Sequence, residues 1–182
     1  MTLSTIGHGT LAADELARLL HDAGVELVVD IRSHPGSRRH PHFGRAALER
    51  WLPDHGLAYV WEPGLGGRRP PRPDTPHTAL TVPAFRGYAD HMETAEFTEA
   101  LDRVLAGAAT RPAAVMCAES VWWRCHRRLL SDAAVLLRHE TVLHVLHDGR
   151  VTEHRPLEEA RVEGDRLVYD AGRRPLPGTA GA

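Results

Sequence analysis

Short apolar runs that alternate with amphipathic helical segments are the feature that most restricts the fold of this sequence. The clearest run is Val-Glu-Leu-Val-Val-Asp-Ile at residues 25–31, which is compact and β-branched, as in strands buried on both faces of a parallel sheet. Further runs of this kind lie at residues 3–7, 57–61, 113–116 and 141–146. This order predicts an α/β fold, with a doubly wound, mostly parallel five-stranded sheet and helices on both faces.

The pattern changes near residue 148, which suggests three parts of unequal size. Residues 1–148 are expected to form a single α/β domain, which is large enough to bury a stable core. Residues 149–170 form an extension in which 151–153 can pair with 166–169 as a small hairpin. Residues 171–182, which end in Pro-Leu-Pro-Gly-Thr-Ala-Gly-Ala, are expected to be a disordered tail.

A proline-rich segment at residues 68–83 interrupts the alternation. Proline lacks the backbone N–H that regular elements use, so this segment is expected to be a long loop. Gly66 and Gly67 precede it and can serve as a hinge. We therefore expect a mobile cover over the ends of the strands.

The composition concentrates positive charge locally on a nearly neutral chain. The sequence has 182 residues, a formal net charge of −2 and no lysine, so all 22 basic residues are arginine. Arginine is concentrated in residues 32–45 and 68–72, and either stretch can contact an anion. No apolar run approaches the ~20 residues of a membrane helix, and no basic leader precedes the first helix. We expect a cytoplasmic protein without a membrane partner, whose oligomeric state the sequence leaves open.

Ionisable or glycine-rich residues follow four of the five expected strands. Loops after parallel strands meet at one edge of the sheet, and ligands bind there. A sheet with a purely structural role has no reason to collect such groups at one edge. The residues at these strand ends are His8, Asp30, Arg32, Ser33, Gly66, Gly67, Cys117 and Glu119.

The most distinctive segment runs from Cys117 to Arg127 with the sequence Cys-Ala-Glu-Ser-Val-Trp-Trp-Arg-Cys-His-Arg. Cys125, His126 and Arg127 are expected to open a helix, whose N-terminus stabilises anions. Neighbouring cations also favour a thiolate, so Cys125 is expected to be the more acidic thiol. Burial at a strand end favours the protonated form of Cys117. The alternative is that Cys117 and the two tryptophans are simply packing residues.

A metal site is a second interpretation of the same segment. Cys117, Cys125, His126 and His8 can in principle form a tetrahedral site. The two cysteines lie eight positions apart, without the short chelating spacing of structural zinc sites. We therefore predict no metal and no other cofactor.

Six short segments occur in an order that is informative as a set. They are Thr-Ile-Gly-His-Gly at 5–9, Val-Asp-Ile-Arg-Ser-His-Pro at 29–35, Leu-Gly-Gly at 65–67, Phe85 with Tyr88 and Met92, Met-Cys-Ala-Glu at 116–119, and Cys-His-Arg at 125–127. In this order, from residue 5 to about 147, the chain resembles the domain of unknown function 488 family. The resemblance implies a compact cytoplasmic α/β domain with no settled activity.

These observations favour an enzyme that acts on a small anionic substrate, such as a nucleotide or a phosphate- or sulfur-bearing metabolite. Cys117 or Cys125 is the expected nucleophile, His126 its acid/base partner and Glu119 an orienting group. The residues expected to bind the substrate are His8, Asp30, Arg32, Ser33, Gly66, Gly67, Tyr88 and Arg127. One alternative is a nucleic-acid-associated module that uses residues 32–45 and 68–72. Another is a metabolite-sensing binding protein without turnover.

Overall fold

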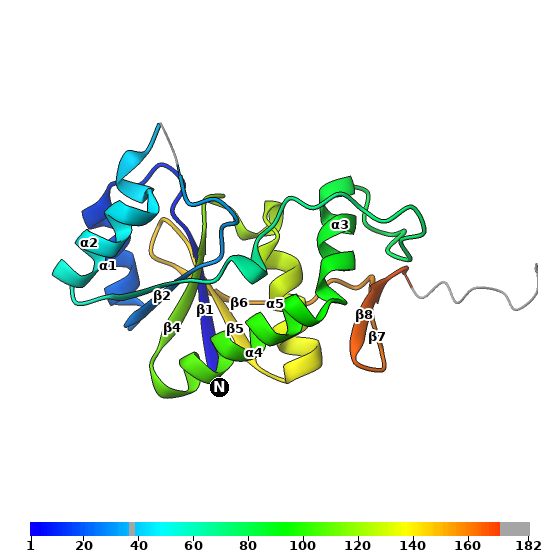
Figure 1. Cartoon of the computed structure of the whole chain (residues 1–182). Coiled ribbons are helices and arrows are strands. Elements are labelled where there is room, and N and C mark those ends of the chain that lie inside the picture. The colour runs from blue at the N-terminus through cyan, green and yellow to red at the C-terminus, as the bar shows by residue number, and fades with distance from the viewer. Residues whose placement is uncertain (37–38, 172–182) are drawn as a thin grey trace, which may run out of the picture.

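A six-stranded sheet with the order β3-β2-β4-β1-β5-β6 lies at the centre of the structure (Figure 1). The computed structural model describes residues 1–36 and 39–171. The first five strands are parallel, and β6 runs antiparallel to β5. The strands are β1 (Thr2–Gly7), β2 (Leu27–Asp30), β3 (Ala58–Trp61), β4 (Ala113–Cys117), β5 (Thr141–Val145), β6 (Val151–Glu153), β7 (Ala160–Glu163) and β8 (Arg166–Tyr169).

Helices cover both faces of this sheet (Figure 1). Helices α1 and α2 pack with one apolar core, and α3, α4 and α5 pack with the other. The α-helices are α1 (Ala13–Asp22), α2 (Arg45–Asp54), α3 (Pro83–Met92), α4 (Ala95–Thr110) and α5 (Arg127–Arg138), with short 3-10 helices η1 (Pro41–Phe43), η2 (Pro63–Leu65) and η3 (Trp122–Arg124). The predicted doubly wound, mostly parallel arrangement is confirmed. Over the residues described, none of the helices combines the length and apolar character needed to cross a membrane.

Local sequence signals account for several of the helix ends. Thr94 caps α4, because its hydroxyl accepts a hydrogen bond from the backbone N–H of Phe97 at 3.3 Å. Gly24 follows α1 with a φ of 69°, the left-handed conformation that ends many helices. The N-cap residue of α1, Ala12, offers no side-chain hydrogen bond.

The alternation of side chains along each strand determines which core a strand end faces. On β4, Met116 belongs to the core beneath α1 and α2, whereas Cys117 belongs to the core beneath α3, α4 and α5. On β2, Val28 faces the first core and Val29 faces the second. Asp30 therefore points toward α1 and α2, on the opposite face of the sheet from Cys117.

The C-terminal extension differs from the prediction in both strand count and pairing. Strand β6 joins the main sheet beside β5, so the sheet has six strands and not five. Gly149, with a φ of 85°, forms the tight turn between them, and Asp-Gly is a strong hairpin signal that the prediction overlooked. Strand β8 pairs with β7 in a separate two-stranded hairpin, so its predicted pairing with residues 151–153 was wrong. Of the predicted tail at 171–182, only Ala171 lies within the described residues.

A buried chain of hydrogen bonds attaches this extension to the sheet and to α5. His144 Nδ1 lies 2.7 Å from the Thr5 hydroxyl, and its Nε2 lies 2.9 Å from His154 Nδ1. His154 Nε2 contacts one oxygen of Asp132 at 2.8 Å, and the Tyr169 hydroxyl donates to the other at 3.0 Å. If both imidazoles are neutral with the proton on Nε2, each group in the chain donates its hydrogen bond toward the Asp132 carboxylate. The buried charge of Asp132 is then fully hydrogen-bonded.

The proline-rich segment has no regular element before Pro83, as predicted. Its middle is nevertheless fixed at several points. The side chain of His77 is fully buried, and the N–H of Ala79 donates to the carbonyl of Tyr169 at 2.9 Å. The N–H of Arg72 donates to the Asp90 carboxylate at 2.8 Å. These anchors argue against the free hinge motion that the sequence suggested.

The buried histidines should make the fold sensitive to acid. Burial, followed by the charges of His154 and Arg127, lowers the pKa of His144 from 6.5 to about 3. The unfolded chain takes up this proton near pH ~6.5. The contribution of His144 to the free energy of unfolding is therefore complete above that pH. It is lost toward pH 3, by up to about 1.4 kcal/mol per pH unit.

Urea denaturation between about pH 7 and pH 4 measures this dependence. His144→Gln should flatten the pH dependence of the unfolding free energy, because glutamine has no proton to take up. His21→Gln is the matched control, since His21 is exposed on α1, and it should keep the slope of the unmodified protein. Equal slopes in all three proteins would contradict the assignment.

Candidate active site

Two free, buried thiols and one imidazole meet at the carboxyl end of the central strand β4. Cys117 is the last residue of β4, and Cys125 lies between η3 and α5. His126 Nδ1 lies 3.6 Å from the Cys125 sulfur and 3.9 Å from the Cys117 sulfur. These three atoms all lie within 4.8 Å of one another. The structure therefore brings three of the four predicted catalytic residues together.

Arg127 is the largest fully buried side chain near the thiols, at 1% exposure. Its Nε donates to the Cys125 sulfur at 3.4 Å, and its Nη2 donates to the carbonyls of Glu119 at 2.5 Å and Ser120 at 3.5 Å. Within residues 1–36 and 39–171, its hydrogen bonds are these three, and no carboxylate pairs with it. Buried charges in proteins are normally paired, and among the described residues the Cys125 sulfur is the ionisable group that this guanidinium contacts.

The two thiols differ in acidity because each shifts the pKa of the other in the opposite direction. The Cys117 thiol donates to Cys125, and with the charges of His126 and Arg127 this lowers the pKa of Cys125 well below its usual value, despite burial. The same hydrogen bond, together with burial, raises the pKa of Cys117. These directions agree with the expected order. Cys125 precedes α5 by two residues, so direct contacts, and not a place in the first helical turn, produce the effect.

The loop that carries the thiols packs against the end of β1 without any space for a side chain. A Cβ atom at Gly7 would lie 1.8 Å from the Glu119 carbonyl oxygen and 2.6 Å from Arg127 Nη2. Glycine is therefore required at this close approach. The predicted role of Glu119 concerns its carboxylate, which is exposed. It is the backbone carbonyl of Glu119 that contacts the site, by accepting a hydrogen bond from Arg127 Nη2.

The loop of residues 65–67, called the glycine loop from here on, covers the imidazole of His126. A Cβ atom at Gly67 would lie 2.6 Å from His126 Nδ1, so the backbone of this residue packs directly on the ring. The Ser33 hydroxyl donates to the Gly67 carbonyl at 3.1 Å, and the Tyr88 hydroxyl donates to the Leu65 carbonyl at 2.9 Å. The Tyr88 ring lies 4.9 Å from that of His126. Ser33 and Tyr88, both predicted to bind substrate, thus hold the cover of the site.

His8, Asp30 and Arg32 form a second group on the other face of the sheet. Arg32 Nε and Nη2 donate to the two oxygens of Asp30 at 2.8 and 2.6 Å. Nη2 also donates to the Phe43 carbonyl at 2.8 Å, and Nη1 to His8 Nε2 at 3.1 Å. Four of the five N–H groups of Arg32 are therefore engaged within the protein. Burial and the Arg32 charge lower the pKa of His8 to about 4, which keeps it a neutral acceptor.

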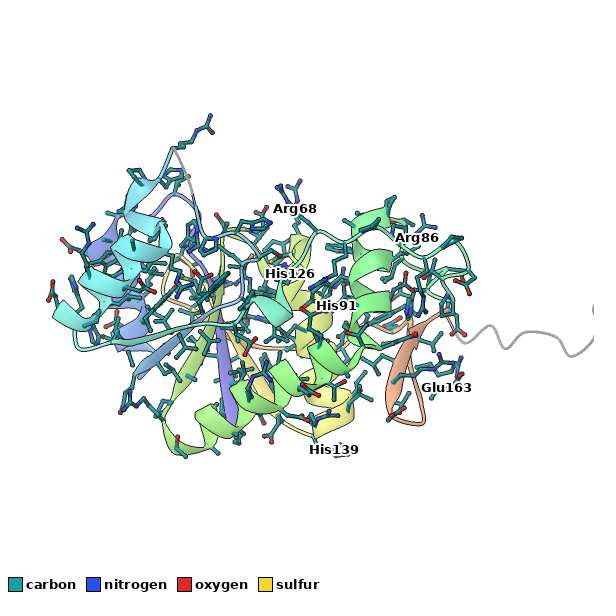
Figure 2. All side chains as sticks on the ribbon, viewed as in Figure 1. Arg68, Arg86, His91, His126, His139 and Glu163 are labelled. Atoms are coloured by element: carbon teal, nitrogen blue, oxygen red, sulfur yellow. The ribbon has the colours of Figure 1, made fainter. Side chains whose placement is uncertain are left out.

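Two residues near the thiols were not assigned to the substrate site from sequence. Arg68 is exposed, directly follows Gly67 and has a φ of 62°, a backbone strain that often marks functional positions. Figure 2 shows its side chain projecting from the molecule on the side of His126. Trp122 stacks on His144 at 4.0 Å with an interplanar angle of 6°. The buried chain of hydrogen bonds through His144 therefore supports the loop between Cys117 and Cys125, called the cysteine loop from here on. Neither a positive φ nor this stacking can be read from sequence.

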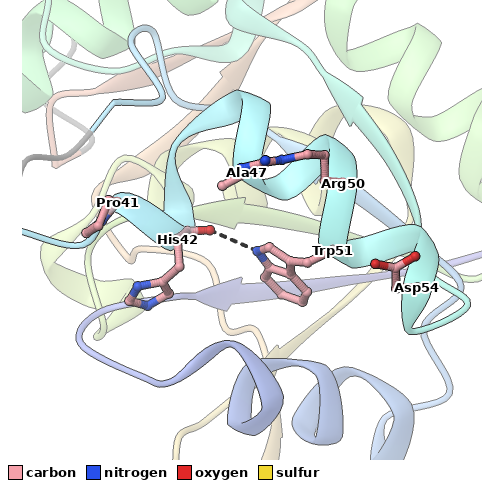
Figure 3. A pocket seen from close by; sticks show the side chains of 6 residues that line it. All are labelled: Pro41, His42, Ala47, Arg50, Trp51 and Asp54. Carbon is pink, nitrogen blue, oxygen red and sulfur yellow. Dashed lines mark hydrogen bonds between the residues drawn. The ribbon is translucent and has the colours of Figure 1, made fainter.

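A pocket of about 550 Å³ lies elsewhere, beside α2 (Figure 3). A hydrogen bond of 2.8 Å from Trp51 Nε1 to the His42 carbonyl joins two of the residues that line it. A second pocket of about 470 Å³ lies at the amino ends of the strands. The predicted site residues line neither pocket. Both cysteines are buried in this conformation, at 8% exposure for Cys117 and 4% for Cys125.

The thiols and the imidazole could also supply three ligands to a thiophilic metal ion. Zinc–sulfur and zinc–nitrogen bonds of ~2.3 and ~2.1 Å in a tetrahedron separate S and N by about 3.6 Å. The observed separations of 3.6 and 3.9 Å are close to that value. The guanidinium of Arg127 already contacts the Cys125 sulfur, and its positive charge would repel a metal ion there. This contact favours a metal-free thiolate.

A family model described as "Domain of unknown function DUF488" matches residues 12–134. This chain belongs to the DUF488 family. The match contains both thiols, His126, Arg127 and the glycine loop, and it leaves His8 and the whole of β1 outside. No curated protein and no solved structure matches the chain.

A double-mutant cycle tests the buried ion pair. Cys125→Ala leaves the Arg127 guanidinium without a counter-ion, so it should lower the free energy of unfolding by about 3–5 kcal/mol. Adding Arg127→Met should restore part of this loss, because the unpaired charge is removed with its partner.

Cys117→Ala is the matched control for this cycle, since it removes an equally buried thiol that carries no charge. We expect it to cost much less than Cys125→Ala in the same urea titration. Equal costs for the two single variants, or strictly additive effects of Cys125→Ala and Arg127→Met, would show that no ion pair is present.

Proposed function

We propose that this DUF488 domain is a thiol-dependent enzyme that acts on a small anionic substrate, with Cys125 as the nucleophile. The observation that carries the proposal is the fully buried Arg127 guanidinium, whose contact on the Cys125 sulfur at 3.4 Å places a cation on this thiol. A thiolate is the reactive form of cysteine. A preformed thiolate can attack an electrophilic centre without first losing a proton.

The neighbours of Cys125 suggest a division of roles. Cys117 stays protonated and donates a hydrogen bond that steadies the thiolate. His126, with Nδ1 at 3.6 Å from the Cys125 sulfur, is within reach to give a proton to a leaving group or to take one from water. Arg127 neutralises the charge and fixes the loop through the Glu119 carbonyl.

The exposed side of the site supports an anionic substrate. Arg68 follows the backbone that covers His126, and within the described residues no hydrogen bond or ion pair engages its side chain. An unpaired guanidinium at the entrance attracts a phosphate- or sulfur-bearing group and can bind it bidentately. Access of the substrate to Cys125 requires only a local displacement of the Gly67 backbone from the imidazole, because the segment that follows is anchored.

The nucleic-acid alternative has less support, because most arginines of the two basic stretches are already paired with acids. The pairs are Arg32 with Asp30, Arg45 with Glu49, Arg69 with Glu96 and Arg72 with Glu93. Arg38 lies outside the described residues. A salt titration of DNA and RNA binding separates this alternative, since only a nucleic-acid module requires a steep salt dependence. A binding protein without turnover would not require a reactive thiol.

The pH dependence of alkylation by iodoacetamide tests the nucleophile. In Cys117→Ser the remaining Cys125 should react with a midpoint below the ~8.5 of free cysteine, because the serine hydroxyl still donates a hydrogen bond. In Cys117→Ala that donor is absent, and the midpoint should rise relative to the serine variant. In Cys125→Ser the remaining Cys117 should titrate above the free value. Midpoints at or above ~8.5 for every variant would refute the thiolate.

The role of Arg68 can be measured without knowing the substrate. Iodoacetate is anionic and iodoacetamide is neutral, so the ratio of their rates reports attraction of an anion to the thiol. We expect Arg68→Ala to lower this ratio by about two- to fivefold, the scale of an exposed charge interaction. Arg124→Ala, which removes another exposed arginine of the cysteine loop, is the control and should change the ratio less. Identical effects would assign the attraction to overall charge.

A further inference from the structure

We propose that the Cys117–Cys125 pair also reduces small hydroperoxides and becomes an intramolecular disulfide in doing so. This inference rests on the proposed function in one respect, because it requires the Cys125 thiolate. It goes beyond that function because Cys117 becomes a second reacting group, and because the oxidant is a neutral molecule and not an anionic substrate.

The placement of the two sulfurs supports the pairing. They belong to the two ends of one loop, Cys117 at the end of β4 and Cys125 just before α5. Both sulfurs and His126 Nδ1 lie within 4.8 Å of one another, and the two residues are separated by seven others. A disulfide needs the sulfurs at ~2.05 Å, so the loop has to close by a small movement. A thiol that resolves an oxidised partner must be this near.

The burial of the pair selects the size of the oxidant. Cys125 is 4% exposed and Cys117 is 8% exposed, and the Gly67 backbone lies directly over His126. Hydrogen peroxide is hardly larger than water and carries no charge, so it can enter where a bulky reagent cannot. Arg127 Nε donates toward the Cys125 sulfur and can also donate to an incoming peroxide oxygen.

The reaction balances with the groups that are present. The Cys125 thiolate attacks the terminal oxygen of ROOH and the O–O bond breaks, which gives a Cys125 sulfenic acid and an alkoxide. The alkoxide leaves as ROH with the proton that Cys125 gave up to His126 on ionising. The Cys117 sulfur then attacks the sulfenic sulfur. A disulfide forms, and the hydroxyl group departs as water with the Cys117 proton. Two electrons pass from the thiols to the peroxide. An external thiol reductant is required only to restore the pair.

Oxidation should loosen the site, because the disulfide carries no charge. Arg127 then loses its counter-ion while it stays buried at 1% exposure, and an uncompensated buried charge is strongly destabilising. The oxidised loop is therefore a strained state that favours reduction. Disulfides of this kind are the labile and catalytic ones.

Hydrogen peroxide is the probe for the full-length reduced protein, and the readout is peptide mapping under non-reducing conditions. We expect a Cys117–Cys125 cross-link that disappears on treatment with a dithiol. Cys117→Ser should stop at a sulfenic acid on Cys125, which dimedone traps when it is added together with a denaturant that exposes the sulfur. Cys125→Ser should leave Cys117 unmodified under the same conditions. Mapping separates these products from oxidation of the three methionines.

Free N-acetylcysteine in a parallel tube sets the reference rate. A cross-link that forms no faster than oxidation of this free thiol, or equal reactivity of the two single variants, would overturn the proposal. The iodoacetamide titration shows whether only the peroxide reaction fails or the proposed nucleophile fails as well. An acidic Cys125 without a cross-link would reject the peroxide reaction and leave the proposed nucleophile standing. Without an acidic thiol, both proposals fail.

Discussion

The buried guanidinium of Arg127 is the constraint on which the shape of the cysteine loop depends. It contacts the Cys125 sulfur and the carbonyls of Glu119 and Ser120, so one side chain ties both halves of the loop together. The close approach of Gly7 leaves no room for a side chain beside these contacts. The interaction that lowers the pKa of Cys125 is therefore the same one that fixes the fold of the loop.

The sheet separates two polar groups that the sequence suggests belong together. His8, Asp30 and Arg32 face the core under α1 and α2, whereas Cys117 faces the core under α3, α4 and α5. The first group closes on itself, because the Arg32 donors are used by Asp30, His8 and Phe43. Its hydrogen bonds join the end of β1 to the end of β2 and to the Phe43 carbonyl.

Much of this architecture could be predicted from the sequence, since the apolar runs give strand identity and order directly. The location of the thiols at the end of β4 follows from the same pattern. The face of the sheet toward which the last side chain of each strand points could not be predicted, because a shift of one residue along the strand reverses that face. The prediction of strand pairing in the C-terminal extension was also wrong, since β6 is only three residues long and gives a weak signal. The positive φ of Arg68 and the stacking of Trp122 on His144 arise from tertiary contacts without a sequence signal.

The match to the DUF488 family begins at residue 12 and ends at 134, but the boundary of the family is not the boundary of a folding unit here. Strand β1 lies between β4 and β5 in the sheet, and both β1 and β5 fall outside the match. A fragment cut at these limits would turn the fully buried β4 into an exposed edge. Such an edge is a template for aggregation. Exchange of modules between relatives would have to carry the first strand and the C-terminal strands along with the thiols.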